Sequence, residues 1–288
     1  MLENDARVWK LSLRDGAVEV HLPDSASLDA ITRQLPQGFY STFRTFDGGK
    51  RVLGLRSHLK RLYQPGGGEI VNPDVNANIF CQHLADILLE YPDEARVRAI
   101  MTMKGEVYIA LTPLVPLPRE IYQQGVKVIT ANARRESPRM KTTAFISASE
   151  SIRNKIASSD IFEALLVHNG SILEGMTSNF FYVRNGNLGT ARNSILLGVT
   201  RRMVLHVARG SGIGIVYRAL RWEQVPGLDE AFLTSSSRGI VPIIQIDSTP
   251  VGEGRPGPYT KRLSIKYGDY VLRRAESIRS VASQTGIA

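Results

Sequence analysis

Apolar and polar residues alternate along the first third of the chain in short runs, which is the pattern of β-strands buried on one face. Turn residues separate the runs, most clearly at Asp47-Gly48-Gly49, a strong hairpin signal. The runs predict strands at 7–13, 18–22, 38–46, 51–55, 96–102 and 106–112. Apolar residues spaced three or four positions apart predict helices, which we place after 25, from 58, and from 72 to about 91.

Three prolines alternate with apolar residues in the segment 113–118. Proline cannot donate a backbone hydrogen bond, so this spacing suits neither a helix nor a central strand. We therefore expect an extended connector here, between a domain at 1–117 and a domain at 118–288. The second domain has predicted strands at 126–130, 163–167, 171–173, 179–183, 213–217 and 231–234, and predicted helices at 145–159 and 200–208. The whole pattern indicates a mixed α/β fold in two unequal domains.

Composition narrows the function classes. The 288 residues are 43% apolar and 22% charged, which is a normal globular mixture. The net charge of +9 is spread among acidic residues, so it does not favour a nucleic-acid partner. The single cysteine, Cys81, rules out an intrachain disulfide and lies in an amphipathic stretch as expected core filler. The first residues show no signal-peptide pattern and no apolar run is long enough for a bilayer, so we expect a soluble, cytoplasmic protein.

Several motifs in the sequence are explained without a functional site. Residues 252–257 spell GxGxxG, but Pro256 and Pro258 bracket the last glycine and the expected βαβ unit is missing, which favours a simple turn. The five histidines show no metal-ligand spacing, so no metal is expected, and a GxSxG elbow is absent from the sequence.

Three other segments carry groups suited to phosphate or buried charge. In 196–202, Gly198 and Thr200 stand just before a predicted helix, whose first amides could bind a phosphate. In 234–239, several hydroxyl groups follow a strand. In 173–181, Glu174 lies between two apolar strands, where a carboxylate needs a cationic partner or becomes protonated. Each segment alone is equally explained as a helix cap or a polar loop.

Together these segments resemble the class IV aminotransferases. That family shows a lysine, then E-G-x-x-S-N-x-F, then L-P-G-I-T-R, then a Ser/Thr-rich turn followed by P-V. This chain matches the pattern in order, and the resemblance covers most of residues 38–263. The matching segments are Gly38-Phe39-Tyr40, Arg44, Asp47-Gly48, His58-Leu59, Arg61-Leu62, Glu174-Gly175, Ser178-Asn179, Phe181, Leu196-Leu197-Gly198-Val199-Thr200-Arg201, Ser235-Ser236-Ser237, Pro242-Ile243 and Gly257-Pro258.

The resemblance implies a fold-type IV enzyme that uses pyridoxal 5'-phosphate. Such a fold has a small α/β N-terminal domain and a larger C-terminal domain with a β-barrel-like core flanked by helices. The family spacing selects Lys141, 33 residues before Glu174, as the lysine that carries the cofactor as a Schiff base. Lys127 and Lys155 are the other lysines of this region. Glu174 would pair with the pyridine nitrogen, and Leu196 would pack on the ring. The implied phosphate-binding group comprises Arg61, Gly198, Val199, Thr200, Ser236 and Ser237.

Three further residues are candidates for substrate binding, namely Tyr40, Arg98 and Arg238, and each could equally serve a surface or structural role. The chain also departs from the family pattern. Ser41 stands where many members carry an acidic residue, Leu197 replaces the proline of L-P-G-I-T-R, and Arg238-Gly239 replaces a small and an acidic residue. These departures bear on the substrate more than on the cofactor.

The expected activity is transfer of an amino group between an amino acid and a 2-oxo acid, with branched-chain L-amino acids as the default donors. Alternatives on the same fold are D-amino acid or amine transamination and an aminodeoxychorismate lyase. A phosphate-binding module without catalysis is the alternative from another class. The resemblance also implies a homodimer with an active site at the domain junction. We expect residues 64–68 to form a mobile loop and Phe80, Leu84 and Leu88 to supply apolar dimer contacts.

Overall fold

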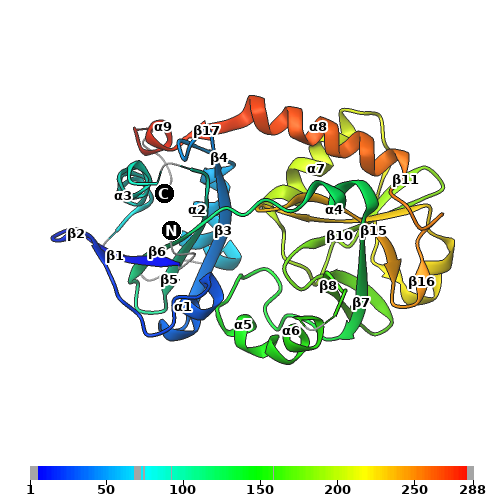
Figure 1. Cartoon of the computed structure of the whole chain (residues 1–288), viewed down its shortest axis with the longest axis horizontal. Coiled ribbons are helices and arrows are strands. Elements are labelled where there is room, and N and C mark those ends of the chain that lie inside the picture. The colour runs from blue at the N-terminus through cyan, green and yellow to red at the C-terminus, as the bar shows by residue number, and fades with distance from the viewer. Residues whose placement is uncertain (1–5, 68–72, 74, 92, 158, 284–288) are drawn as a thin grey trace. The chain divides into compact units, whose positions relative to one another are not determined.

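The computed structural model describes residues 6–67, 73, 75–91, 93–157 and 159–283. Its contacts divide the chain into two compact units (Figure 1). Unit 1 comprises Met1–Val115, Met140–Ala148 and Arg273–Ala288, and unit 2 comprises Pro116–Arg139 and Ser149–Leu272. The first crossing falls within the proline-rich connector. The sequence predicted contiguous domains at 1–117 and 118–288, and this division stays a prediction. In the structure, residues 140–148 and 273–288 group with unit 1.

Unit 1 contains a seven-stranded antiparallel sheet in the order β17-β4-β3-β5-β6-β1-β2. At the hairpin between β3 and β4, Asp47, Gly48 and Gly49 all have positive φ, a conformation that glycine tolerates best. The turn signal therefore marked a real reversal of the chain. The strands are β1 Arg7–Ser12, β2 Gly16–Glu19, β3 Gly38–Phe46, β4 Arg51–Leu53, β5 Ala95–Thr102, β6 Val107–Pro113 and β17 Ala275–Ser277.

Helices cover both faces of this sheet. Apolar residues of β3, β5 and β6 on one face pack against α2, α3 and α9, while the other face packs against α1 and α5. Along β3, Ser41 and Phe43 therefore belong to the first face and Tyr40 to the second. The helical segments of unit 1 are α1 Leu28–Gln34, α2 Leu55–Tyr63, η1 Pro65–Gly67, α3 Ala77–Leu89, α5 Ala144–Ala148 and α9 Ile278–Ser283.

Helix α3 corrects two expectations. It begins at Ala77, where the Asn76 side chain accepts from the first amides as an N-cap, rather than near residue 72. Residues 72 and 74 lie outside the described part of the chain. The side chains of Phe80, Leu84 and Leu88 are buried in the core of unit 1, so this face cannot supply dimer contacts. Cys81 is buried in the same core, as expected.

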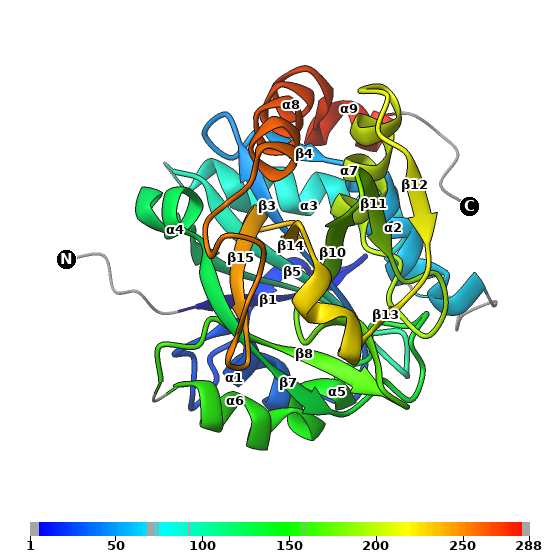
Figure 2. The same cartoon turned by 90° about the vertical axis from the view of Figure 1, so that its right-hand side faces the viewer.

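Unit 2 contains a ten-stranded mixed sheet in the order β12-β11-β10-β14-β15-β7-β8-β9-β13, with β16 paired to β15. Parallel pairs join β15 to β7 and β7 to β8. Figure 2 shows β10, β14 and β15 side by side in the resulting half-barrel, which confirms the expected fold class. The strands are β7 Val126–Asn132, β8 Glu163–His168, β9 Ser171–Gly175, β10 Asn179–Arg184, β11 Asn187–Thr190, β12 Ile215–Tyr217, β13 Leu220–Arg221, β14 Glu230–Ser235, β15 Gly239–Ile246 and β16 Thr249–Pro250.

The helical segments of this part of the chain are α4 Arg119–Gln124, α6 Glu150–Ala157, α7 Val199–Arg209, η2 Trp222–Gly227 and α8 Pro258–Arg274. Helix α8, which follows the GxGxxG letters, was not predicted from the sequence. Residues 252–254 form a turn, and the first amides of α8, from Tyr259 and Thr260, donate to the buried Glu230 carboxylate at 2.8 and 2.7 Å. A protein carboxylate therefore occupies the helix start that a dinucleotide would need. Within the described ranges, no helix has the length and apolar character needed to span a membrane.

Candidate active site

Lys141 belongs to a short segment that pairs with the beginning of β3. The Tyr40 amide donates to the Lys141 carbonyl at 2.9 Å, and the Thr143 amide donates to the Gly38 carbonyl at 2.9 Å. The Gly38 amide in turn donates to the Thr143 hydroxyl at 3.0 Å, which closes the pairing from the other side. Residues separated by about a hundred positions are thus joined as in a strand pair. The backbone of Lys141 is fixed, and its Nζ lies 4.5 Å from the centre of the Tyr40 ring.

The guanidinium carbon of Arg98 lies 4.7 Å from the centre of the same ring. Its side chain is almost fully buried and forms an ion pair with Asp29 at 2.7 Å. It also donates to the Leu28 carbonyl and to the Thr32 hydroxyl, both at 2.8 Å. Arg98 therefore ties β5 to α1 and supports the Tyr40 ring.

Arg61 stands near the end of α2, next to β3. Its Nη2 donates to the Ser41 hydroxyl at 2.9 Å and lies 3.3 Å from Nδ1 of His58. Ser41 and His58 are buried, whereas Arg61 is partly exposed. Of these three side chains, Arg61 is therefore the one that solvent or a ligand can reach.

Glu174 is a buried carboxylate of unit 2, near the end of β9. Arg135 donates to it from Nε at 3.1 Å, the Leu196 amide donates at 3.1 Å, and Asn179 donates at 3.3 Å. The sequence predicted that Glu174 needs a cationic partner, but it did not identify Arg135. The available signal was a basic doublet, Arg134-Arg135, in a loop six residues before Lys141.

The amide groups in the first turn of α7 have no side-chain cap. Gly198 is its N-cap and has no side chain to offer the first amides, which have no partner within a helix. A Cβ at this position would overlap the Asn179 side-chain oxygen, so glycine is required there. The Thr200 hydroxyl lies 3.2 Å from the Ser236 hydroxyl, which brings the β14–β15 turn to the same helix end. The helix begins at Val199, one residue before the predicted start at Thr200, and Ser237 follows in the β14–β15 turn.

Arg238 uses its guanidinium within unit 2. It forms an ion pair with the buried Glu163 at 3.1 Å and donates to the Thr177 hydroxyl at 2.6 Å and the Ser235 hydroxyl at 3.1 Å. The Thr177 hydroxyl also contacts Glu163 at 3.1 Å. Arg238 therefore joins the β9–β10 turn to the β14–β15 turn.

The candidate residues fall into two groups, described separately. Lys141, Tyr40, Arg61 and Arg98 belong to unit 1, and Glu174, Leu196, the α7 start, the serine turn and Arg238 belong to unit 2. Across the described positions, no group of three His, Cys, Asp or Glu side chains could hold a metal ion.

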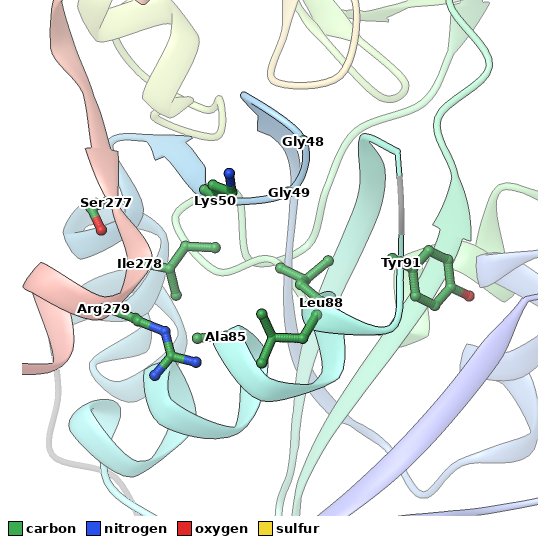
Figure 3. Close-up of a pocket in the computed structure, with 10 residues that line it drawn as sticks. Gly48, Gly49, Lys50, Ala85, Leu88, Tyr91, Ser277, Ile278 and Arg279 are labelled. Carbon is green, nitrogen blue, oxygen red and sulfur yellow. The ribbon is translucent and has the colours of Figure 1, made fainter.

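A separate pocket of about 480 Å³ lies in unit 1 between the β3–β4 hairpin, the end of α3 and the start of α9 (Figure 3). Its lining includes the apolar side chains of Leu88 and Ile278 and the cationic side chains of Lys50 and Arg279 (Figure 3). The pocket is lined by Gly48, Gly49, Lys50, Ala85, Leu88, Leu89, Tyr91, Ser277, Ile278 and Arg279.

Comparison with known proteins gives a consistent result. The model of the family amino-transferase class IV matches residues 38–246. The D-alanine aminotransferase of Bacillus licheniformis is 27% identical over 256 residues, covering 83% of this chain and 89% of that one. The branched-chain-amino-acid aminotransferase of Pseudomonas aeruginosa is 24% identical over 300 residues, covering 96% of each chain.

Among solved structures, a Thermotoga maritima protein provisionally assigned as a branched-chain amino acid aminotransferase superposes with a TM-score of 0.76. Its sequence is 26% identical, and the match covers 93% of this chain and 96% of that one. Because the family model spans well over half of the residues, the chain belongs to the class IV aminotransferases.

Proposed function

We propose that Lys141 is the residue that binds pyridoxal phosphate covalently in this transaminase. The observation that carries this assignment is the pairing of residues 141–143 with β3, which holds the lysine against the Tyr40 ring. The two alternatives have other surroundings. Lys127 forms an ion pair with Asp160 at 2.6 Å, and Lys155 is exposed on α6.

The donor groups of the chain fit the cofactor. Pyridoxal phosphate presents a phosphate dianion, a pyridine nitrogen and an aldehyde. The α7 amides with the hydroxyls of Thr200 and Ser236 suit the phosphate, and the Arg61 guanidinium adds a charged donor. A buried carboxylate, Glu174, suits a protonated ring nitrogen, and the Lys141 amine suits the aldehyde.

When bound, this cofactor supplies an electron sink that stabilises negative charge at the substrate α-carbon. The residues of the chain do the rest. Glu174 keeps the ring nitrogen protonated, and Arg135 and the Leu196 amide orient Glu174. The Lys141 amine would take the proton from the α-carbon of the substrate. Leu196 would supply an apolar contact to the ring.

For the substrate, we propose a branched-chain L-amino acid as donor and a 2-oxo acid as acceptor. Support comes from the relatives that are branched-chain-amino-acid aminotransferases. A D-alanine aminotransferase is also among the relatives, so the experiment must compare L- and D-donors. Arg98 and Arg238 have ion-pair partners within their units, which favours structural roles for both. Tyr40, beside Lys141, is the candidate that we retain for substrate contact.

A panel of donors tests this proposal. Purified enzyme would be assayed with L- and D-forms of branched-chain and small amino acids, and with primary amines, against 2-oxoglutarate and pyruvate. We expect L-branched-chain donors to give the highest kcat/KM. Preference for D-donors or amines would overturn the substrate proposal, and release of pyruvate from aminodeoxychorismate would identify the lyase instead.

We also propose a cytoplasmic homodimer. The lone, buried Cys81 is compatible with a reducing compartment. The family resemblance supports the dimer, but α3 does not provide its contacts, and the loop expected at 64–68 is described only as far as Gly67. Light scattering at micromolar concentration should give about twice the 31.8 kDa chain mass. An active monomer would refute this assembly.

A further inference from the structure

Three side chains of unit 1, from Ser41, His58 and Arg61, form a closed hydrogen-bonded group between β3 and α2. Ser41 Oγ lies 2.9 Å from His58 Nδ1 and 2.9 Å from Arg61 Nη2, and Nη2 lies 3.3 Å from the same Nδ1. Ser41 and His58 are each 1% exposed. Each atom of the group therefore contacts the other two, and two of the three residues are inaccessible to a ligand.

The chemistry of these groups determines which atom donates. A guanidinium has five N–H donors and no acceptor, so Arg61 donates to the Ser41 oxygen. Arg61 Nη2 can also only donate in its contact with His58 Nδ1, so Nδ1 carries no proton. The Ser41 hydroxyl, 2.9 Å from the same atom, then donates its hydrogen to Nδ1. All three contacts thus agree on an uncharged His58 with its proton on Nε2.

The fold holds this group in place. His58 and Arg61 are three residues apart on α2 and so lie on the same face of that helix. Leu55, Leu59 and Leu62 of α2 are buried in the core. The Phe43 ring, on the same face of β3 as Ser41, lies 5.0 Å from the His58 ring. Neither the helix nor the imidazole can shift without disturbing the core.

We propose that Ser41 and His58 are positioning residues that orient the Arg61 guanidinium for a phosphate monoester. This inference rests on the proposed function, in which Arg61 binds the cofactor phosphate. An arginine side chain loses conformational freedom when it binds a ligand, and part of that loss is removed if the side chain is already held. Because both partners are uncharged, they orient the guanidinium without neutralising it.

The test compares two ligands that differ only in the group that Arg61 would contact. Pyridoxal phosphate and pyridoxal, which lacks the phosphate, would be titrated against full-length apoprotein, with Schiff-base absorbance as the readout. In Ser41→Ala, we expect the dissociation constant for pyridoxal phosphate to rise about 3- to 10-fold, the range for one lost hydrogen bond. The constant for pyridoxal should stay unchanged.

Two variants of His58 test the positioning role independently of Ser41, one retaining an acceptor near Nδ1 and one lacking it. His58→Asn places an amide oxygen near the position of Nδ1 and should retain most of the affinity for pyridoxal phosphate. His58→Leu lacks an acceptor and should behave as Ser41→Ala does. Thr45→Val is the matched control, because it removes a buried hydroxyl from the same strand that bonds to Ala95 instead of Arg61. Its ratio of the two ligand affinities should equal that of the wild type, whatever its stability.

The outcomes separate the two proposals. If Arg61→Ala leaves the affinity for pyridoxal phosphate unchanged, the proposed role of Arg61 is wrong. If Arg61→Ala weakens it but Ser41→Ala and His58→Leu do not, or weaken both ligands equally, the positioning role is wrong. In the Arg61→Ala background, Ser41→Ala should cause no further loss of affinity for pyridoxal phosphate. A further loss as large as the one in the wild-type background would also overturn the positioning role. If Ser41→Ala fails to fold, the comparison of His58→Asn with His58→Leu decides the question alone.

Discussion

Arg135 and Glu174, 39 residues apart in the sequence, form an ion pair in which the side chains are only 4% and 2% exposed. The arginine also donates to the Met176 carbonyl at 2.8 Å, which ties it to the turn after β9. A buried charge without its partner is costly, so each residue depends on the other. The pair fixes a carboxylate next to the Leu196 amide, and we propose that this carboxylate accepts from the protonated ring nitrogen of the cofactor.

Replacing the carboxylate tests its role directly. Glu174→Gln should retain the cofactor but lower kcat about 10²- to 10³-fold, because an amide does not keep the ring nitrogen protonated. The measurement is steady-state turnover with saturating pyridoxal phosphate, with cofactor content followed by absorbance. A rate near that of the wild type would show that another group pairs with the nitrogen.

Removing the arginine instead should affect folding. Arg135→Met leaves Glu174 buried without this cation and should lower the free energy of unfolding by about 3–5 kcal/mol. Urea denaturation of the apoprotein measures this loss. Arg134→Met, next to it and exposed, is the control and should change stability little. Equal stability of the two variants would contradict the structural role of the pair.

Chemical labelling locates the cofactor lysine. Borohydride reduction of the holoenzyme should attach the cofactor to the peptide that contains Lys141, and Lys141→Ala should abolish turnover. Peptide mass spectrometry identifies the site. Label on Lys127 or Lys155 would refute the assignment.

Arg98 offers a choice between two roles. Arg98→Met breaks the contacts to Asp29, Leu28 and Thr32 and should lower the free energy of unfolding by about 1–3 kcal/mol, with little change in KM for the amino donor. Thermal unfolding and donor kinetics on the same preparation decide between the roles. A large rise in KM at unchanged stability would return Arg98 to substrate binding.

The lone thiol should be inert in the native protein. Burial disfavours the thiolate and raises the pKa of Cys81 to about 12. At pH 8 only about one molecule in ten thousand then carries a thiolate, against roughly a quarter for an ordinary cysteine. Alkylation by iodoacetamide, followed by mass spectrometry, should be slow in buffer and fast in denaturant. Rapid modification of the folded protein would contradict the burial of this side chain.

Local signals in the sequence predicted much of the fold. The turn at Asp47-Gly48-Gly49 and the strands that flank it follow from residues close in sequence, as does the start of α7 at Val199. Long-range pairings were not accessible in this way. Nothing near residue 141 indicates that its neighbours bond to Gly38 and Tyr40, and nothing near Glu174 selects Arg135 over other arginines.

An amphipathic pattern also does not identify the surface against which its apolar face packs. The apolar side of α3 was expected to face a second subunit, but it packs in its own core, because a hydrophobic stripe does not say what covers it. In the same way, α8 was missed because its start is stabilised by Glu230, which lies in a distant strand.

Unit 1 is built from three separate segments of the chain, and this affects the order in which it is completed during synthesis. Strand β17 completes one edge of its sheet, and Ile278 and Val281 of α9 contribute to its core. A ribosome makes the first strands of this unit early, yet it must translate all of unit 2 before the last strand and helix emerge. The unit begun first is therefore finished last. Until then, the edge of β4 that later pairs with β17 has no hydrogen-bonded strand beside it. A nascent chain stopped before residue 275 would expose that edge to chaperones or to other chains.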